Sequence, residues 1–272
     1  RREIVTERNL FIGIIGVGIL GNAIKRYYEE NHYEVFCYDK FKNTGSIEEV
    51  NKAAIGFNCV PTPRGQNNEC DTSIVDEAIG YLADRKIVVI KSTVIPGTTD
   101  RLQNKYPRHQ LLFSPEFLKA KHAYTDFKSP KHQIIGYTAR SESVAGGVLG
   151  IMPCGKYNKI MPAAAAEMFK YVRNSFLAVK NSFFNQIYDL CQKTKVEYRF
   201  IKECAENDPW IGQEHLDPTQ DDYRGFNGAC LPKDTEAFLA WAKKNNIDLS
   251  VLEEVVKFNS ELLASQNIKK DS

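Results

Sequence analysis

The sequence predicts an α/β protein in which an N-terminal domain with a parallel sheet is followed by an all-helical domain. Two observations support this prediction. Short apolar runs alternate with helical patterns up to Tyr137, and a single long helical pattern opens the remainder of the chain. With 272 residues, the chain is long enough for two packed cores. We expect the boundary near residue 162, with one domain at 1–162 and a second at 163–272.

Six short apolar runs are the expected strands of the first domain. Helical patterns lie between several of them, notably at 23–30 and 73–84, and a glycine-rich helix follows the last run. Strands that are apolar almost throughout and alternate with helices belong to a parallel sheet covered on both faces. The expected strands lie at residues 11–15, 35–39, 54–60, 86–93, 110–115 and 133–137.

A long helix is expected at residues 163–194, where it connects the two domains. Pro162 stands at a position typical of a helix start, and the run after it contains no further proline or glycine. At 1.5 Å per residue the helix would be roughly 48 Å long. Further helices around a loop rich in Asp, Pro and Gly are expected up to about residue 265. The apolar residues of the long helix recur at spacings of three and four, which places them on one face: Phe169, Val172, Phe176, Val179, Phe183 and Ile187.

Composition excludes several classes of protein. The 36 Lys and Arg and 34 Asp and Glu leave a formal charge of +2, which does not favour a dedicated nucleic-acid binder. Seven cysteines without a C-x-x-C pair argue against a zinc site or other metal site and against a disulfide framework, so we expect a reduced, cytoplasmic compartment. The longest apolar stretch, at 11–24, is too short to cross a bilayer as a helix, so no membrane partner is expected.

A glycine-rich loop follows the first expected strand. Gly16, Gly18 and Gly21, with Ile19 and Leu20 between the last two, form G-x-G-x-x-G. The first glycine permits a tight turn, the second lets backbone amides approach a pyrophosphate, and the third lets the helix pack on the strand. Asp39 ends the second expected strand, where its carboxylate can accept a hydrogen bond from a ribose 2′-hydroxyl. We therefore predict a Rossmann domain at 1–162 that binds NAD rather than NADP, although the neighbouring Lys40 weakens that preference.

Four further residues suggest chemistry. Lys170 and Asn174 lie four positions apart on the long helix, so their side chains point the same way. An ammonium beside an amide suits a developing alkoxide, and a solvated lysine is the simpler alternative. Cys230 lies in a glycine-rich turn near Lys233, where backbone donors favour a thiolate; an inert buried cysteine is the alternative. Asp234 either caps the helix that follows or takes part in catalysis.

Six further segments have distinctive wording: CVPTP at 59–63, KSTVIPGTT at 91–99, SPEFL at 114–118, AEMFKYVRNSFLA at 166–178, NDPWIG at 207–212 and GFNGACLPKD at 225–234. Their order and wording resemble the UDP-glucose/GDP-mannose dehydrogenase family over about residues 10–265. In that family the C6 hydroxyl of a nucleotide-linked hexose is oxidised twice, with two NAD in succession, to a carboxylate. The resemblance implies that a cysteine holds the aldehyde as a thiohemiacetal, which becomes a thioester and is then hydrolysed.

The resemblance also implies roles for individual residues. Cys230 matches the nucleophile, Lys170 and Asn174 match the groups around the reacting oxygen, and Asp234 matches the carboxylate that orients a water or the lysine. Thr93 matches a water-binding threonine, and Glu116 the glutamate that assists thioester hydrolysis. Pro61, Thr62 and Thr93 are expected on the cofactor side. The residues expected to bind the nucleotide sugar are Phe117, Leu118, Lys170, Asn174, Gly225 and Phe226.

The resemblance raises two expectations about assembly. Family members normally continue into a second nucleotide-binding domain that holds UDP or GDP, and we expect this chain, which ends at Ser272, to lack it. Three explanations are open: a smaller substrate, a separate subunit that supplies the missing half, or a nucleotide held less completely. The resemblance also suggests a homodimer, with the helical domain at 163–272 as its interface.

Two other functions are compatible with the sequence. A β-hydroxyacid-type dehydrogenase also joins a Rossmann domain to a helical domain at about this length, with a Lys-x-x-x-Asn pair on a helix. It transfers a single hydride and needs no cysteine, so it leaves GFNGACLPKD at 225–234 unexplained. The other alternative is a protein that binds NAD without catalysing a reaction.

Overall fold

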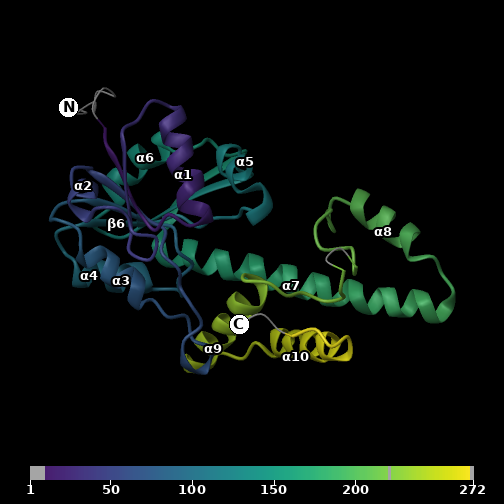
Figure 1. Cartoon of the computed structure of the whole chain (residues 1–272). Helices are drawn as coiled ribbons and strands as arrows, with labels where there is room; N and C mark the ends of the chain where they lie inside the picture. The colour runs from purple at the N-terminus through teal and green to yellow at the C-terminus, as the bar shows by residue number, and fades with distance from the viewer. Residues whose placement is uncertain (1–9, 220–221, 270–272) are drawn as a thin grey trace. The chain divides into compact units, whose positions relative to one another are not determined.

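The computed structural model describes residues 10–219 and 222–269 and divides into two compact units (Figure 1). The first unit comprises the chain up to Pro63 together with Asp71–Lys170. The second comprises the short segment Arg64–Cys70 and the chain from Tyr171 onward. The first unit contains the sheet and the second is helical, which confirms the predicted α/β class with a helical region after the sheet.

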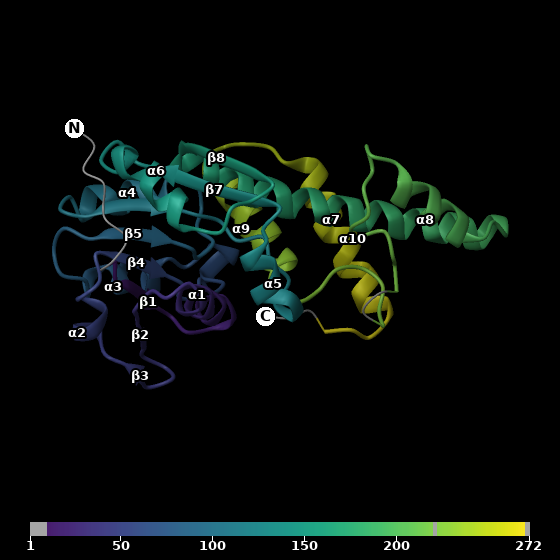
Figure 2. The same cartoon turned by 90° about the horizontal axis from the view of Figure 1, so that it is seen from above.

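An eight-stranded sheet forms the centre of the first unit, in the order β3-β2-β1-β4-β5-β6-β7-β8 (Figure 2). Every strand run expected from the sequence is part of it. The two strands that were not expected, β3 and β8, lie at its two edges. The strands are β1 (Ile12–Ile15), β2 (Val35–Asp39), β3 (Thr44–Gly45), β4 (Ile55–Asn58), β5 (Ile87–Ile90), β6 (Gln110–Phe113), β7 (His132–Tyr137) and β8 (Tyr157–Pro162).

The sheet is mostly parallel rather than parallel throughout. β2 and β3 pair in antiparallel fashion, as do β6 and β7, whereas β7 and β8 are parallel to each other. β3 follows β2 through a tight turn that contains Asn43 at φ 49°, a conformation that asparagine tolerates better than most residues. The five strands β1, β2, β4, β5 and β6 form the parallel core that the alternating pattern predicts.

Helices cover both faces of this sheet (Figure 1). On one face, α1, α5 and α6 bury apolar side chains against Ile14, Phe57 and Leu112. On the other face, α2, α3, α4 and the first turn of α7 pack against Val88 and Phe113. Two cores that sandwich one sheet explain why its central strands are apolar at almost every position.

The helices agree with the sequence in the middle of each element and differ at several ends. The expected helix at 23–30 begins earlier, at Ile19, and the one expected at 73–84 ends at Gly80. The long helix spans 163–194 as predicted. The helices are α1 (Ile19–Glu30), α2 (Ile47–Val50), α3 (Ser73–Gly80), α4 (Thr98–Lys105), α5 (Ala123–Lys128), α6 (Glu142–Ile151), α7 (Ala163–Thr194), α8 (Tyr198–Asn207), α9 (Leu231–Lys244) and α10 (Ser250–Ser265), with 3₁₀ turns η2 (Gln66–Asn68) and η3 (Ala120–His122).

The start of α7 lies directly on the sheet because β7 contains a glycine. A Cβ on Gly136 would lie 2.8 Å from the Cα of Ala163, so only glycine permits this approach. From Tyr171 onward α7 belongs to the second unit. There some of its apolar side chains are exposed: Val172 is 47% exposed, Phe176 60% and Phe183 53%. Others, such as Tyr171, Ala178, Phe184 and Cys191, are buried. The buried positions also include polar residues: Asn174, Ser175, Asn181, Ser182 and Asn185.

The rest of the second unit packs around α7. Tyr171 stacks on Phe238 of α9, with ring centroids 5.5 Å apart, and Phe238 stacks in turn on Trp241. The segment Arg64–Cys70 joins this unit through the ion pair of Arg64 with Glu236, at 2.6 Å. Within the described ranges, no helix combines the length and apolar character needed to cross a membrane.

Candidate active site

The glycine loop has the geometry that dinucleotide binding requires. Gly16 adopts φ +91°, and its N–H donates to the Tyr38 carbonyl at 2.8 Å. A Cβ on Gly21 would lie 1.9 Å from the Gly16 carbonyl oxygen, so the third glycine is needed for the helix to pack against the loop. A Cβ on Gly18 would instead point into open space. The middle glycine therefore leaves the loop open on the side where a pyrophosphate would approach.

The N-terminus of α1 fits an anionic group. Gly18 is the N-cap and has no side chain that could bond the amides of the first turn. Ile19 at the start of the helix is 59% exposed, whereas Leu20 packs partly against the core between α1 and the sheet. Free N–H groups and the positive end of the helix dipole together favour a phosphate. These residues fit the pyrophosphate of NAD.

Asp39 ends β2 beside this loop. One carboxylate oxygen accepts from the Val17 N–H at 2.7 Å, and the other accepts from the N–H groups of Phe41 and Lys42 at 3.0 and 3.1 Å. The ammonium of Lys40 pairs with Glu77 at 3.0 Å. A cleft beside Asp39 is lined by Gly16, Tyr38, Phe41, Pro61 and Tyr81, among others. The carboxylate is thus fixed in place at the side of this cleft.

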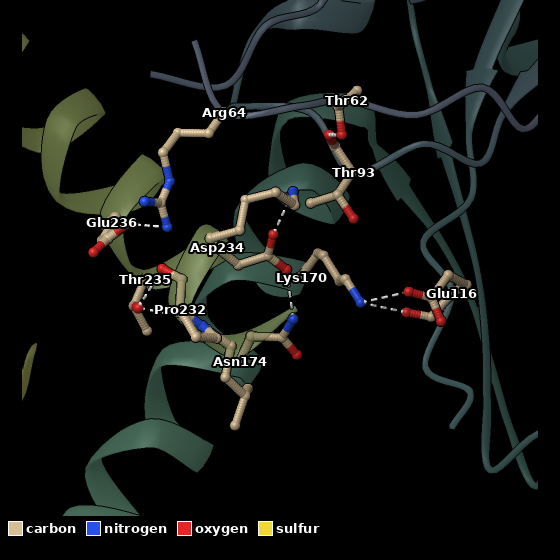
Figure 3. Close-up of polar contacts among 12 residues, drawn as sticks. Thr62, Arg64, Thr93, Glu116, Lys170, Asn174, Pro232, Asp234, Thr235 and Glu236 are labelled. Carbon is tan, nitrogen blue, oxygen red and sulfur yellow. Dashed lines mark hydrogen bonds and ion pairs between the residues drawn. The ribbon is translucent and has the colours of Figure 1, made fainter. Parts of the chain in front are cut away.

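The segments after β4 and β5 lie next to each other on the same unit. The hydroxyl of the buried Thr62 donates to the Thr93 carbonyl at 2.8 Å (Figure 3). A second hydrogen bond, from Ser92 Oγ to the Val60 carbonyl at 2.6 Å, also holds these two segments together. Pro61, Thr62 and Thr93, which the sequence assigns to the cofactor side, are thus brought together at the carboxyl end of the parallel strands.

Lys170 and Glu116 form an ion pair with little exposure to solvent. Lys170 Nζ lies 2.9 Å from Glu116 Oε1 and 2.8 Å from the Glu116 carbonyl, and the side chains are 4% and 18% exposed (Figure 3). The Leu118 N–H donates to the second carboxylate oxygen at 2.9 Å. The Phe117 ring lies below the ammonium, 5.6 Å from Nζ to the centroid. The predicted residues Glu116, Phe117, Leu118 and Lys170 therefore form one cluster.

The charge of Lys170 determines the state of Glu116. Burial by itself would raise the pKa of this carboxyl, but the Lys170 ammonium, its hydrogen bond and the Leu118 N–H outweigh burial and hold the pKa below its ordinary value. Glu116 is therefore ionised at neutral pH. An ionised carboxylate can accept a proton from a water molecule.

A second cluster lies in the second unit around Asp234. Asn174 Nδ2 donates to Asp234 Oδ2 at 2.6 Å, and Lys233 Nζ lies 2.8 Å from Asp234 Oδ1 (Figure 3). Asp234 is only 2% exposed. It lies in the first turn of α9, but its side chain bonds Asn174 and Lys233. The N-cap residue of α9 is Cys230, whose carbonyl accepts from the Asp234 N–H at 2.9 Å.

The surroundings of Lys233 in this second cluster favour its charged ammonium form. Burial lowers the pKa of Lys233, but the charge of Asp234 and its hydrogen bond, with smaller contributions from Cys70 and Cys230, raise it overall. Cys230 is exposed. A thiol at a helix N-terminus near an ammonium is in surroundings that favour negative charge on sulfur.

The glycine-rich turn before Cys230 is fixed by Asn259 of α10. The Asn259 amide accepts from the Phe226 N–H at 2.7 Å and donates to the Phe226 carbonyl at 2.8 Å. Gly225 adopts φ +96°, and a Cβ there would lie 2.6 Å from Asn259 Oδ1. Gly225 and Phe226 thus hold the turn in place, and the Phe226 side chain is buried.

The predicted site residues therefore form two sets. The first unit carries the glycine loop, Asp39, the segments with Pro61, Thr62 and Thr93, and the Glu116–Lys170 cluster. The second unit carries Asn174, Asp234, Cys230 and the turn before Cys230. Lys170 and Asn174 lie one turn apart on α7 but bond different carboxylates. No group of three or more His, Cys, Asp or Glu side chains that could hold a metal ion occurs within residues 10–219 and 222–269.

Two buried ionisable residues were missed by the sequence reasoning. Lys91 is 3% exposed and bonds Ser114 Oγ at 3.1 Å; burial lowers its pKa to about 8. Glu167 is fully buried and bonds the segment before α4. A lysine that ends the apolar run at 86–90 was the one available signal for Lys91. Glu167 gave none, because a glutamate in the first turns of a helix is common on surfaces.

Comparison with known proteins decides the family. Residues 38–148 match the NAD binding domain of the UDP-glucose/GDP-mannose dehydrogenase family, and residues 164–261 match its central domain. The chain belongs to this family. Its first unit therefore carries the NAD-binding domain of a UDP-glucose/GDP-mannose dehydrogenase, in agreement with the glycine loop and the sheet.

Individual relatives agree with this assignment. A UDP-glucose 6-dehydrogenase from Rickettsia bellii is 31% identical over 244 residues, which are 86% of this chain and 53% of the relative. The chain spans about half the length of the curated relatives it matches. A UDP-glucose dehydrogenase structure from Pyrobaculum islandicum shares the fold at a TM-score of 0.82 and 24% identity, over 95% of this chain and 70% of that one. A 3-hydroxyisobutyrate dehydrogenase from Mycobacterium tuberculosis shares it at a TM-score of 0.75 and 14% identity, over 96% of both chains.

Proposed function

We propose that this member of the UDP-glucose/GDP-mannose dehydrogenase family oxidises the C6 hydroxyl of a nucleotide sugar to a carboxylate through Cys230. One observation carries the proposal. Asp234, one turn after Cys230 on α9, bonds Asn174, which lies one turn after Lys170 on α7. This bond supports the proposal because it joins two of the residues that the family resemblance assigns to the double oxidation.

The reaction balances as two oxidations and one hydrolysis. When bound, NAD would supply the hydride acceptor for each oxidation, so two NAD would be used in succession for each sugar. After the first, the Cys230 sulfur adds to the aldehyde carbon, and the resulting thiohemiacetal loses a second hydride to leave a thioester. Water then cleaves the carbon–sulfur bond, releasing the acid and returning the thiol. Covalent attachment keeps the aldehyde from leaving between the two oxidations.

The proposed role of each side chain follows from its charge. The Lys170 ammonium and the Asn174 amide donate to the substrate oxygen while it carries negative charge. Glu116, held ionised by Lys170, takes a proton from the water that attacks the thioester, and Thr93 binds that water. Asp234 fixes the Asn174 amide by accepting a hydrogen bond from its nitrogen at 2.6 Å. Phe117, Leu118, Gly225 and Phe226 are assigned to the sugar-nucleotide side.

The proposal is tested by measuring NADH formation from UDP-glucose, UDP-N-acetylhexosamines and GDP-mannose. Cys230→Ala should abolish acid formation and leave NAD binding intact. Cys204→Ala is the matched control, because Cys204 is also an exposed cysteine of the second unit but belongs to α8. Unchanged acid formation by Cys230→Ala would remove the cysteine from the mechanism.

We further propose that the chain forms a homodimer through α7. The exposed apolar side chains Val172, Phe176, Phe183 and Leu190 repeat along one face of this helix. Phe176→Asp should shift the protein from dimer to monomer in analytical ultracentrifugation, whereas Gln192→Asp, on the opposite side of α7, should not. A wild-type monomer would contradict this proposal.

A separate subunit that holds the nucleotide and a cytoplasmic location remain predictions.

A β-hydroxyacid-type dehydrogenase is the second candidate function. The observation in its favour is that the 3-hydroxyisobutyrate dehydrogenase fold matches 96% of both chains. Such an enzyme would use Lys170 and Asn174 for a single oxidation, and Cys230→Ala would retain activity. Turnover of a small 3-hydroxyacid, with no reaction on nucleotide sugars, would favour this candidate over the first.

A further inference from the structure

We infer that Glu167 is a positioning residue that ties the segment carrying Thr93 to the turn of α7 that carries Lys170. The inference rests on the proposed function for its effect on turnover. The contact itself is read from the first unit alone, in which Glu167, Thr93 and Lys170 all lie. No role in NAD binding or in the chemistry is assigned to Glu167.

Glu167 caps a helix to which it does not belong. α4 begins at Thr98, and its N-cap is Gly97, which adopts φ +91° and has no side chain to bond the first amides. Glu167 Oε2 accepts from the Gly97 N–H at 2.6 Å. Glu167 Oε1 accepts from the Thr99 N–H at 2.8 Å and from its hydroxyl at 2.6 Å. The carboxylate of α7 thus supplies the cap that the sequence of α4 lacks.

Three donors converge on this one side chain, which selects for a carboxylate. A glutamine amide offers only one acceptor oxygen and would turn its NH₂ group toward at least one donor. Glu167 is 0% exposed, so water cannot replace a lost partner. Burial raises the pKa of Glu167 to about 7, whereas the hydrogen bonds from Thr99 and Gly97 lower it. Glu167 therefore joins α7 to the start of α4 through specific hydrogen bonds, and not through packing alone.

Both segments that Glu167 joins carry predicted site residues. Thr93 lies four residues before Gly97, and its carbonyl is held by Thr62 at 2.8 Å, so Glu167 and Thr62 fix opposite ends of one short segment. On α7, Lys170 lies three residues after Glu167 and therefore on the same side of the helix, where it bonds Glu116. Moving the carboxylate would shift Thr93 relative to Lys170.

The experiment compares Glu167→Gln with Asp76→Asn. Asp76 of α3 holds the other end of α4, accepting from Lys105 at 2.8 Å and from the Tyr106 hydroxyl at 2.6 Å. Both variants weaken the attachment of the same helix, but only the first loosens the Thr93 segment. We expect Glu167→Gln to lower kcat roughly 10-fold with little change in KM, and Asp76→Asn to leave both near wild type.

Amide hydrogen exchange gives a readout that does not depend on turnover. The amides of Gly97 and Thr99 should exchange faster in Glu167→Gln than in the wild type, and at the wild-type rate in Asp76→Asn. Thr99→Val, which removes one of the three donors and keeps the side-chain volume, should show a smaller effect in the same direction. This milder variant keeps the test usable if Glu167→Gln fails to fold.

Two results would overturn the inference: equal losses of kcat in Glu167→Gln and Asp76→Asn, or unchanged exchange at Gly97 and Thr99 in Glu167→Gln. Failure of the proposed function looks different. In that case the wild type forms no NADH from any nucleotide sugar, while the exchange rates still show whether Glu167 holds the Thr93 segment.

Discussion

Removing the ammonium of Lys170 should destabilise the first unit in a way that depends on pH. Lys170→Met keeps the length and apolar stem of the side chain but leaves Glu116 without its ion-pair partner at 2.9 Å. Breaking a buried ion pair from one side costs about 3–5 kcal/mol. Because Glu116 is still 18% exposed, we expect the lower end, a loss of about 3 kcal/mol in the free energy of unfolding at pH 7.

The sign of the pH dependence follows from the pKa of Glu116. In the wild type Lys170 holds this pKa below its ordinary value, so the pair stabilises the fold above that range and its contribution is lost as pH falls. In Lys170→Met only the Leu118 N–H and the charge of Lys91 still oppose burial, so the pKa rises and Glu116 takes up a proton more readily. The difference between wild type and variant should therefore shrink from pH 7 to pH 4.

Urea unfolding followed by far-ultraviolet circular dichroism measures this effect. Circular dichroism is needed because Trp210 and Trp241 both lie in the second unit and do not report on the first. The double variant with Glu116→Gln is the control, since it removes the unpaired charge and should recover most of the loss. A loss below about 1 kcal/mol, or one that is the same at pH 7 and pH 4, would refute the buried ionised pair.

Three further predictions concern the first unit. Burial lowers the pKa of Lys91 to about 8, so the stability of the wild type relative to Lys91→Met should rise by roughly 3 kcal/mol between pH 8 and the ordinary lysine pKa near 10.4; chemical unfolding of both proteins measures this difference, and one that stays constant with pH would contradict it. Gly18→Ala should keep the wild-type melting temperature, because its Cβ points into open space, but should weaken NAD binding in calorimetry, because the pyrophosphate is expected in that space. Unchanged affinity would show that the pyrophosphate does not bind beside Gly18. Gly21→Ala should lower the melting temperature as well, since its Cβ would lie 1.9 Å from the Gly16 oxygen, and a stable variant would contradict the loop geometry.

Local sequence patterns predicted the parts of the fold that local physics determines. The helix at 163–194 follows from an uninterrupted run of helix-compatible residues, and the central strands follow from apolar runs. β8 was missed because an edge strand needs no apolar face, and its residues, YNKIMP, are exposed or half-buried. β3 was missed because two residues carry no periodic pattern.

The pairing within the site could not be predicted from spacing. Lys170 and Asn174 point the same way on α7, but their partners are 54 and 60 residues away in the chain, at Glu116 and Asp234. Only the fold brings these residues together. The same holds for Glu167, whose donors lie 68 and 70 residues away, at Thr99 and Gly97.

Exposure along α7 was also beyond the reach of the sequence. The spacing placed the apolar residues on one face, but it could not show whether this face lies inside the unit or on its surface. Phe176 is 60% exposed, whereas the polar Asn185 is 1% exposed. Asn185 bonds Arg224, and the apolar Phe184 and Cys191 of the same helix are buried as well. The buried surface of α7 is therefore mixed in polarity, and the spacing of its apolar residues does not locate that surface.

The number of NADH formed per nucleotide sugar tests the double oxidation most directly. With limiting UDP-glucose or GDP-mannose and excess NAD, we expect about two NADH for each sugar consumed, with a carboxylate identified as the product by mass spectrometry. One NADH for each sugar, with an aldehyde as the final product, would contradict it.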